Sequence, residues 1–338
     1  MNQKYMYSLI AVIVLILIAY VGVEAAGLQV LFGIIIPYIA VLIFIAGFVY
    51  RVMDWASSAV PFRIPSTCGQ QKTLSWIKHD KIDNPTTTIG VIIRMMLEIL
   101  LFRSLFRNTK FALHEGPKIS YVWEKWLWLV ALAFHYSFLV VLIRHLRFFL
   151  EPVPVWLQWL EEADTFFQLG LPGLFLSGAV LLGVTTFLFL RRIYLPEMRY
   201  ISLAADYFPL FLIIGLAITG ILMRYFTKVY IVGVKELAIG LASFHPTIPE
   251  GIGALFYIHL FLVSVFFAYF PFSKLMHLPG IFLSPTRNLA NNTRFKRHIN
   301  PWNYPVEVHT YQEYEDEFRE KMIDAGLPVE KGLPVEKE

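Results

Sequence analysis

Two apolar stretches decide the fold: AFHYSFLVVLIRHLRFF at 133–149 and FYIHLFLVSVFFAYFPFSKLMH at 256–277. Each lies in a run long enough for a helix to cross the ~30 Å hydrocarbon core of a bilayer, which takes about 20 residues. Each stretch also carries two histidines. Because an imidazole inside a membrane is costly and needs a partner, these histidines indicate a functional site carried by two membrane-spanning helices.

Four more apolar runs of similar length accompany these two. The predicted spans are approximately Tyr5–Val23, Leu28–Tyr50, Trp126–Ile143, Phe166–Leu190, Tyr207–Met223 and Gly251–Phe272. The whole chain is 57% hydrophobic and only 16% charged, against about 25% charged residues in soluble domains. We therefore expect an all-α integral membrane protein with six transmembrane helices in a bundle. The first run is expected to be a retained helix, because no small-residue cleavage site is evident before the next run.

The charged residues gather between the spans and divide the chain into parts. The predicted parts are an extra N-terminal span at 1–27, the second span at 28–50, a basic loop at 51–125, a four-helix part at 126–279 that carries the histidines, and a tail at 280–338. Within the loop, Ile89–Arg107 has charges too dense for a span and predicts an amphipathic helix, either on the membrane surface or against a partner subunit. The tail ends in a tandem GLPVEK repeat at Gly326–Lys331 and Gly332–Lys337, which predicts a flexible end or a docking strand.

Positive charge indicates the orientation, since cytoplasmic loops carry an excess of Lys and Arg. The segment Arg51–Lys125 holds eleven Lys or Arg against six Asp or Glu, whereas Glu151–Asp164 holds four acids and no Lys or Arg. Both termini are therefore expected on the cytoplasmic side of the cytoplasmic (inner) membrane, although Arg224, Lys228 and Lys235 would then lie outside. The net charge of +4 belongs to this bias and not to nucleic-acid binding.

Four of the nine histidines belong to the third and sixth spans: His135 and His145 lie on the third, His259 lies on the sixth, and His277 lies just past it. Two b-type haems with bis-histidine ligation need four imidazoles in two pairs. The third span runs outward and the sixth inward, so His135 and His277 are expected near the cytoplasmic side, and His145 and His259 near the outer side. The rises along the two helices differ, at about 15 Å for ten residues and about 27 Å for eighteen, and Pro271 is expected to bend the sixth span.

Two alternatives stay open for these histidines: hydrogen bonding between helices, and a proton path. A zinc ion is less suitable, because its ligands converge on one point whereas the two pairs lie at different depths. The other five histidines are expected to be ordinary surface residues; they are His79, His114, His245, His298 and His309.

Three basic residues flank the histidines. Arg144 and Arg147 lie on either side of His145, and Lys274 precedes His277 by three positions. Each could contact a haem propionate, for which the guanidinium fork is well suited, or extend its charged end to lipid headgroups. The sequence favours neither use.

The two histidine spans and the run FPFSKLMH at 270–277 resemble the cytochrome b subunit of respiratory nitrate reductase, the NarI-like family. The resemblance extends over Ile36–Pro279 and includes IPYIAVLIFIAGFVYR at 36–51 and LRRIYLPEMR at 190–199. The extra N-terminal span, the long loop and the tail resemble the DsrM-type branch (HmeC), from the DsrMKJOP (Hme) complex of sulfate reducers.

This resemblance implies a function. Members of the family bind two b haems through the four matched histidines and oxidise a quinol, here menaquinol, near the outer haem. The family's lysine after the third span has no counterpart in Glu151–Phe167, so Glu161, Glu162 and Asp164 are the candidate proton acceptors of the quinone site. In DsrM-type complexes electrons go to a cytoplasmic iron–sulfur subunit (DsrK-like, resembling heterodisulfide reductase), alongside other membrane and periplasmic subunits, in sulfate or sulfite respiration. Because Cys68 is the single cysteine, an iron–sulfur cluster must lie on a partner.

Two other functions remain open. One is the related membrane subunit of a methanogen heterodisulfide reductase, with methanophenazine as the electron carrier. The other is a haem-free membrane anchor or transporter that docks soluble subunits. Transporters of this size usually show internal repeats between their halves, and the sequence contains none of that kind, which disfavours the second of these functions.

Overall fold

The structure is a computed structural model, and it describes residues 3–58, 69–116, 118–165, 175–295, 305 and 308–331. The chain divides into two compact units, Met1–Asn292 and Thr293–Glu338. The start of the predicted tail, at 280–292, therefore belongs to the first unit. Several predicted features lie outside the described residues; they are Cys68, His298, the start of the fourth span at 166–174 and the second repeat copy at 332–338.

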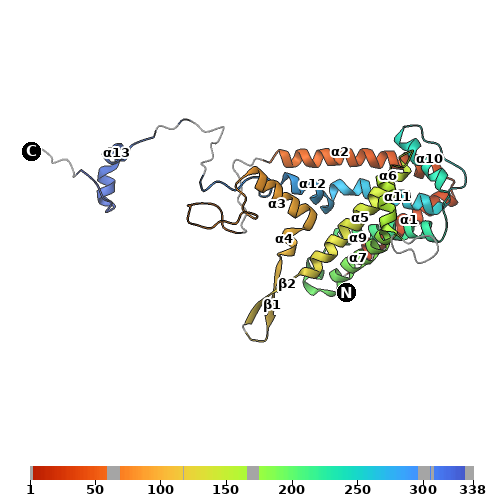
Figure 1. The fold of residues 1–338 in the computed structure, drawn as a ribbon, viewed down its shortest axis with the longest axis horizontal. Helices are drawn as coiled ribbons and strands as arrows, with labels where there is room; N and C mark the ends of the chain where they lie inside the picture. Colours follow the sequence, from red (N-terminus) through yellow and green to blue (C-terminus); the bar gives the residue numbers. More distant parts are fainter. Residues whose placement is uncertain are drawn as a thin grey trace, which may run out of the picture. The chain divides into compact units, whose positions relative to one another are not determined.

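Six helices of the first unit, among the described residues, are long and apolar enough to cross a membrane, which confirms the six predicted spans (Figure 1). They are α1 (Lys4–Glu24), α2 (Ile36–Ala56, entered through a π-helical turn at Leu31–Ile35), α5 (Lys125–His145, continued by a 3-10 turn at Leu146–Phe148), α7 (Leu176–Tyr194), α9 (Ala204–Tyr225) and α11 (Ala254–Tyr269, continued by a 3-10 turn at Phe270–Phe272). Large apolar side chains such as Leu42 and Ile45 point outward, as expected for helices surrounded by lipid.

Shorter elements connect and flank the spans. They are α3 (Thr88–Leu101), α4 (Arg103–Phe106), β1 (Thr109–His114), β2 (Lys118–Trp123), α6 (Val155–Asp164), α8 (Pro196–Ile201), α10 (Ile231–Ala242), α12 (His277–Leu283) and α13 (Tyr311–Asp324). The antiparallel hairpin of β1 and β2 is not predicted by the sequence analysis; it places His114 opposite Lys118. Gly116 in its turn has a φ of +79°, a left-handed conformation that glycine adopts without steric cost.

The core of the first unit lies where α1, α9 and α11 pack together and α11 packs on α2. Its fully buried side chains include Tyr207 and Leu212 of α9 and Tyr257 and Leu262 of α11. The helix α5 instead packs on α7, which in turn packs on α9. In the described part of the chain, α5 and α11 therefore have different packing neighbours, although both carry histidines.

The end of α11 is fixed by a close approach of α2. A Cβ atom at Gly47 would lie 2.8 Å from the Cβ atom of Pro271 and 3.0 Å from the Phe272 ring, so this contact needs a glycine. The α-helix ends at Tyr269, and the chain continues through two 3-10 turns to α12. The sixth span therefore breaks around Pro271, and His277 begins a separate helix.

The amphipathic helix expected at Ile89–Arg107 is divided in two. Phe102, with a left-handed φ of 48°, separates α3 from α4. The Arg94 side chain is only 6% exposed, and it donates hydrogen bonds to the carbonyl oxygens of Asp83 (3.0 Å) and Thr286 (3.1 Å). Burial lowers the pKa of the Arg94 guanidinium from its ordinary value. Arg94 is thus a buried residue that links the loop before α3 to the segment after α12, and not a surface charge.

The opposite face of α3 is apolar and exposed. Its members recur at helical spacing and are between 45% and 71% exposed; they are Ile89, Ile92, Ile93, Met96 and Leu100. Contact of this face with the membrane surface, or with a partner subunit, stays a prediction.

The second unit contains a helix that the sequence does not predict, while a flexible end or a docking strand at the repeat stays a prediction. Its helix α13 begins with a capping box, in which Thr310 and Glu313 exchange side-chain and backbone hydrogen bonds. The first copy of the repeat folds back on α13, because the Glu315 carboxylate accepts from the backbone N–H groups of Glu330 (2.8 Å) and Lys331 (2.8 Å). These hydrogen bonds lower the pKa of Glu315. Over its described residues, the tail therefore forms a helix with an intramolecular turn.

Candidate functional site

The four intramembrane histidines lie as two pairs between α5 and the α11–α12 segment. His135 of α5 lies beside His277, with ring centroids 5.9 Å apart and ring planes at 87°. His145, at the end of α5, lies beside His259 of α11, with centroids 6.3 Å apart and planes at 11°. The structure thus places together the residues that the sequence pairs by depth; their role as haem ligands stays a prediction.

The break in the sixth span lies between its two histidines. In one continuous helix, His259 and His277 would be about 27 Å apart, against about 15 Å for the two histidines of α5. Ser273 adopts an extended conformation between the two 3-10 turns, and its hydroxyl accepts a hydrogen bond from the Leu275 N–H at 3.1 Å. His259 before this break and His277 after it both lie beside a histidine of α5.

Each imidazole is held through its Nδ1 atom. Three histidines donate to main-chain carbonyl oxygens, in the pairs His135–Ala131 (2.8 Å), His145–Val141 (2.7 Å) and His277–Lys274 (2.8 Å). The Nδ1 atom of His259 instead lies 2.7 Å from the hydroxyl oxygen of Thr219. Because a carbonyl oxygen only accepts, the first three imidazoles carry the proton on Nδ1 and the lone pair on Nε2. This is the arrangement in which a histidine serves as a metal ligand through Nε2.

The ring-centroid distances of both pairs are compatible with one metal ion between two imidazoles. With metal–nitrogen bonds of about 2 Å, two rings on opposite sides of one metal have centroids about 6 Å apart, close to the 5.9 Å and 6.3 Å observed. No three His, Cys, Asp or Glu side chains converge as metal ligands among the residues that the structure describes. Two protein ligands suffice for iron in a porphyrin, which needs only axial ligands, whereas a tetrahedral zinc site takes three or four.

Aromatic rings line both pairs. The His135 ring meets the rings of Phe102 and Phe134 edge-on, with centroid distances of 4.8 and 5.1 Å. The ring centroids of His145 and Phe148 are 5.9 Å apart. An apolar shell of this kind limits solvent access and influences the redox potential of a bound metal.

Phe102 reaches His135 because α3 is tied to α5. The Trp128 indole N–H donates to the Leu101 carbonyl at 2.7 Å, and the Tyr136 hydroxyl donates to the Leu100 carbonyl at 2.9 Å. These two hydrogen bonds hold the end of α3, where the chain turns into α4, against α5. The cytoplasmic loop of the sequence-based prediction is therefore part of the surroundings of the His135 pair.

The two arginines at the end of α5 form ion pairs with α6. Arg144 lies 2.8 Å from an Asp164 carboxylate oxygen and donates to the Ser177 hydroxyl at 3.2 Å. Arg147 donates to both carboxylate oxygens of Glu161, at 2.9 and 3.0 Å. Two of the acids predicted for the quinone site thus neutralise the two arginines predicted for propionates. Both predicted roles remain proposals, and each guanidinium already has a carboxylate partner.

Lys274 forms an ion pair with Asp206 at the start of α9. Its Nζ lies 2.6 Å from the carboxylate, which also accepts from the Leu203 N–H at 3.0 Å. The Lys274 side chain is 80% exposed and the Asp206 side chain only 6%. The lysine therefore neutralises a buried carboxylate, while most of its side chain stays open to headgroups or to a propionate.

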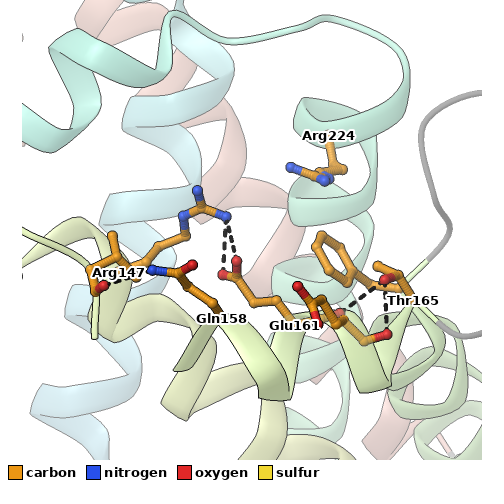
Figure 2. A pocket seen from close by; sticks show the side chains of 8 residues that line it. Arg147, Gln158, Glu161, Thr165 and Arg224 are labelled. Atoms are coloured by element: carbon orange, nitrogen blue, oxygen red, sulfur yellow. Dashed lines mark hydrogen bonds and ion pairs between the residues drawn. The ribbon is translucent and has the colours of Figure 1, made fainter. Parts of the chain in front are cut away.

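The third predicted acid, Glu162, lines a pocket of about 500 Å³ near the end of α5 that carries His145 (Figure 2). Figure 2 shows the ion pair of Arg147 and Glu161 on one side of this pocket and Arg224 of α9 on the other. Among the described residues, the Glu162 carboxylate has no hydrogen bond or ion pair. The pocket thus combines two guanidinium groups with one uncommitted carboxylate.

The basic residues that disturb the charge pattern lie beside the acidic segment. Lys235 of α10 forms an ion pair with Glu151, and Arg224 lines the same pocket as Glu161 and Glu162. Lys235 is therefore neutralised locally by an acid of this segment.

Three residues around these sites are not predicted as site residues from the sequence: Phe102, Thr219 and Arg224. A threonine in an apolar span ordinarily bonds to the carbonyl four residues back, and Thr219 does so with Gly215 at 2.8 Å. Its second contact, with His259, depends on how α9 and α11 pack, and no local pattern predicts it. Arg224 is a charged residue at the end of a span, and this pattern predicts only a position at the membrane–water interface.

Comparisons with known proteins agree with this architecture. Residues 90–297, which include all four histidines, match the family described as nitrate reductase gamma subunit. A protein of Archaeoglobus fulgidus, named Hdr-like menaquinol oxidoreductase cytochrome b-like subunit, is 46% identical over 286 residues, covering 82% of this chain and 85% of that protein. A protein of the same name from Archaeoglobus profundus is 43% identical over 274 residues, covering 79% and 81%.

Proposed function

Because the chain belongs to the nitrate reductase gamma (NarI-like) family of cytochrome b subunits, we propose that it is the dihaem membrane subunit of a menaquinol oxidoreductase. One haem would be held by His135 and His277, and the other by His145 and His259. When bound, the two b-type haems would supply one-electron carriers across the bilayer. The observation that carries this proposal is the presence of two imidazole pairs at a metal-bridging distance.

The protein's own part is to position the ligands and to keep water away from them. The four Nδ1 hydrogen bonds fix the ring orientations and raise the basicity of Nε2. Phe102, Phe134 and Phe148 give both pairs apolar neighbours. Burial, axial ligands and second-sphere hydrogen bonds are the features through which a protein sets a haem potential.

Menaquinol oxidation is placed at the pocket lined by Glu162. Conversion of a quinol to a quinone releases two electrons and two protons, so the site needs a proton acceptor and donors for the ring oxygens. Glu161 and Asp164 are engaged in ion pairs, which leaves the Glu162 carboxylate to take the two protons in turn. Because Glu162 is exposed, it would pass each proton on to solvent. Arg147 and Arg224 line the same pocket and would donate hydrogen bonds to a quinone oxygen.

This location suits a menaquinol site that delivers electrons to the His145–His259 pair. Arg147, which lines the pocket, follows His145 by two residues. The pocket therefore lies close in sequence to a histidine of that pair. The same end carries the acidic segment Glu151–Asp164 and is proposed to face outward from the cytoplasmic membrane. Protons from the quinol would then be released outside, with both chain termini on the cytoplasmic side.

Electrons would leave from the His135–His277 pair to a cytoplasmic iron–sulfur subunit of the DsrK-like, heterodisulfide-reductase-like kind, in sulfate or sulfite respiration. The term Hdr-like in the names of both relatives supports such a partner, and other membrane and periplasmic subunits would complete the complex. The same names include menaquinol, which favours menaquinol over methanophenazine as the carrier.

The test is direct reduction by a quinol. We expect a soluble menaquinol analogue to reduce the purified, haem-loaded protein, seen as b-type bands in the reduced-minus-oxidised spectrum. Dithionite gives the reference for full reduction, and a dihydrophenazine analogue is the comparison carrier. A protein that dithionite reduces fully and the menaquinol analogue does not would contradict the proposed function.

A further inference from the structure

One of the four histidines differs from the rest in its Nδ1 partner. Three donate to carbonyl oxygens of their own chain segment, three or four residues back. The Nδ1 atom of His259 in α11 is instead hydrogen-bonded to the Thr219 hydroxyl of α9, at 2.7 Å. Among the four, His259 is therefore the histidine whose Nδ1 partner is a side chain. A substitution of that side chain can remove this hydrogen bond without disturbing a backbone group.

The Thr219 hydroxyl is the acceptor of this bond when His259 ligates iron through Nε2, because the ring proton then lies on Nδ1. The single hydrogen of the hydroxyl has main-chain acceptors of its own, since Oγ1 lies 2.8 Å from the Gly215 oxygen and 3.1 Å from the Leu216 oxygen. A lone pair of Oγ1 is then available for the His259 N–H. A hydroxyl that already donates is also polarised into a better acceptor.

The surroundings keep this arrangement in place. Thr219 is only 5% exposed, so water does not compete for the bond. The helices α9 and α11 pack directly on one another, and one turn away a Cβ atom at Gly215 would lie 3.5 Å from the Leu262 side chain. Among the residues that the structure describes, Thr219 is thus the hydrogen-bond partner of the His259 Nδ1 atom.

We propose that Thr219 is a positioning residue that sets the reduction potential of the iron ligated by His259. The inference rests on the proposed ligation by His259. An Nδ1–H group that donates to a good acceptor makes Nε2 a stronger electron donor, which favours the oxidised metal. The hydroxyl therefore lowers the potential of this haem relative to the same haem without it.

The experiment compares Thr219→Val, which keeps the shape and removes the acceptor, with Thr219→Ser, which keeps the hydroxyl. Both variants of the full chain are titrated against wild type by optical redox titration, with the electron paramagnetic resonance spectrum of the oxidised haems as a second readout. In Thr219→Val we expect the reduction equilibrium constant of the His145–His259 haem to rise about tenfold, which is about 59 mV for a one-electron couple. Thr219→Ser should keep the wild-type value, and the His135–His277 haem is unchanged in both.

Thr219→Ala is the control for side-chain shape, since it removes the hydroxyl and the β-branch together. It should shift the potential in the same direction as Thr219→Val. An unchanged potential in both variants, with both haems retained, would overturn the inference and leave the ligation by His259 standing. A wild-type protein without a haem at His145–His259 would instead overturn the proposed function.

Discussion

Replacement of His145 by alanine is expected to remove one b-type haem and to leave the other. The His145 and His259 rings are 6.3 Å apart, so loss of either imidazole leaves a single axial ligand at that site. The other site lies about 15 Å away along α5 and keeps both of its ligands. In the reduced-minus-oxidised spectrum and the redox titration, one component should disappear while the second keeps its potential.

The chain offers matched controls for this experiment. His259→Ala should reproduce the spectrum of His145→Ala, and His135→Ala should remove the opposite component. His245→Ala should retain both components, because His245 is exposed and its Nδ1 bonds only to the Ser243 carbonyl, at 2.8 Å. Equal loss of both components in His145→Ala, or loss of neither, would contradict the pairing.

Glu162→Gln is expected to slow menaquinol oxidation strongly without changing the haems. A positioned acid or base typically contributes 10²–10⁴-fold to a rate, so the fall should be about 100-fold or more. Glutamine keeps the size and polarity of the side chain but does not accept a proton. Pre-steady-state haem reduction by a menaquinol analogue measures this effect, and dithionite reduction checks that both haems are intact.

Glu250→Gln is the control for the loss of a negative charge near the acidic end. Glu250 is exposed, and the pocket is lined by other residues. Its variant should oxidise menaquinol at the wild-type rate. A wild-type rate in Glu162→Gln would show that another group takes the proton, and the pocket would then lose its proposed role.

The six spans were predictable because the bilayer imposes a length and an apolar composition that a sequence shows directly. The structure extends most predicted ends by a few residues; the second span, for example, runs to Ala56 and not to Tyr50. The pairing of histidines also followed from simple geometry, since two antiparallel helices bring equal depths together. The sequence leaves open how the unequal spacings are accommodated; in the structure the sixth span breaks near Pro271, and both pairs form.

The polar contacts were not predictable, because their partners are distant in sequence and depend on packing. Arg144 and Arg147 carry the same signal whether they meet a propionate, a headgroup or an acid on α6. Arg94 looked like a surface charge, yet carbonyl groups from two separate segments surround it. Thr219 carried no signal, since its contact with His259 exists only once α9 packs on α11.

The most direct measurement is the haem content of the purified chain, expressed with an ample supply of haem and determined as the pyridine haemochrome against protein concentration. The account predicts two b-type haems for each polypeptide, one for each imidazole pair. A colourless chain, or one that binds a single haem, would contradict it.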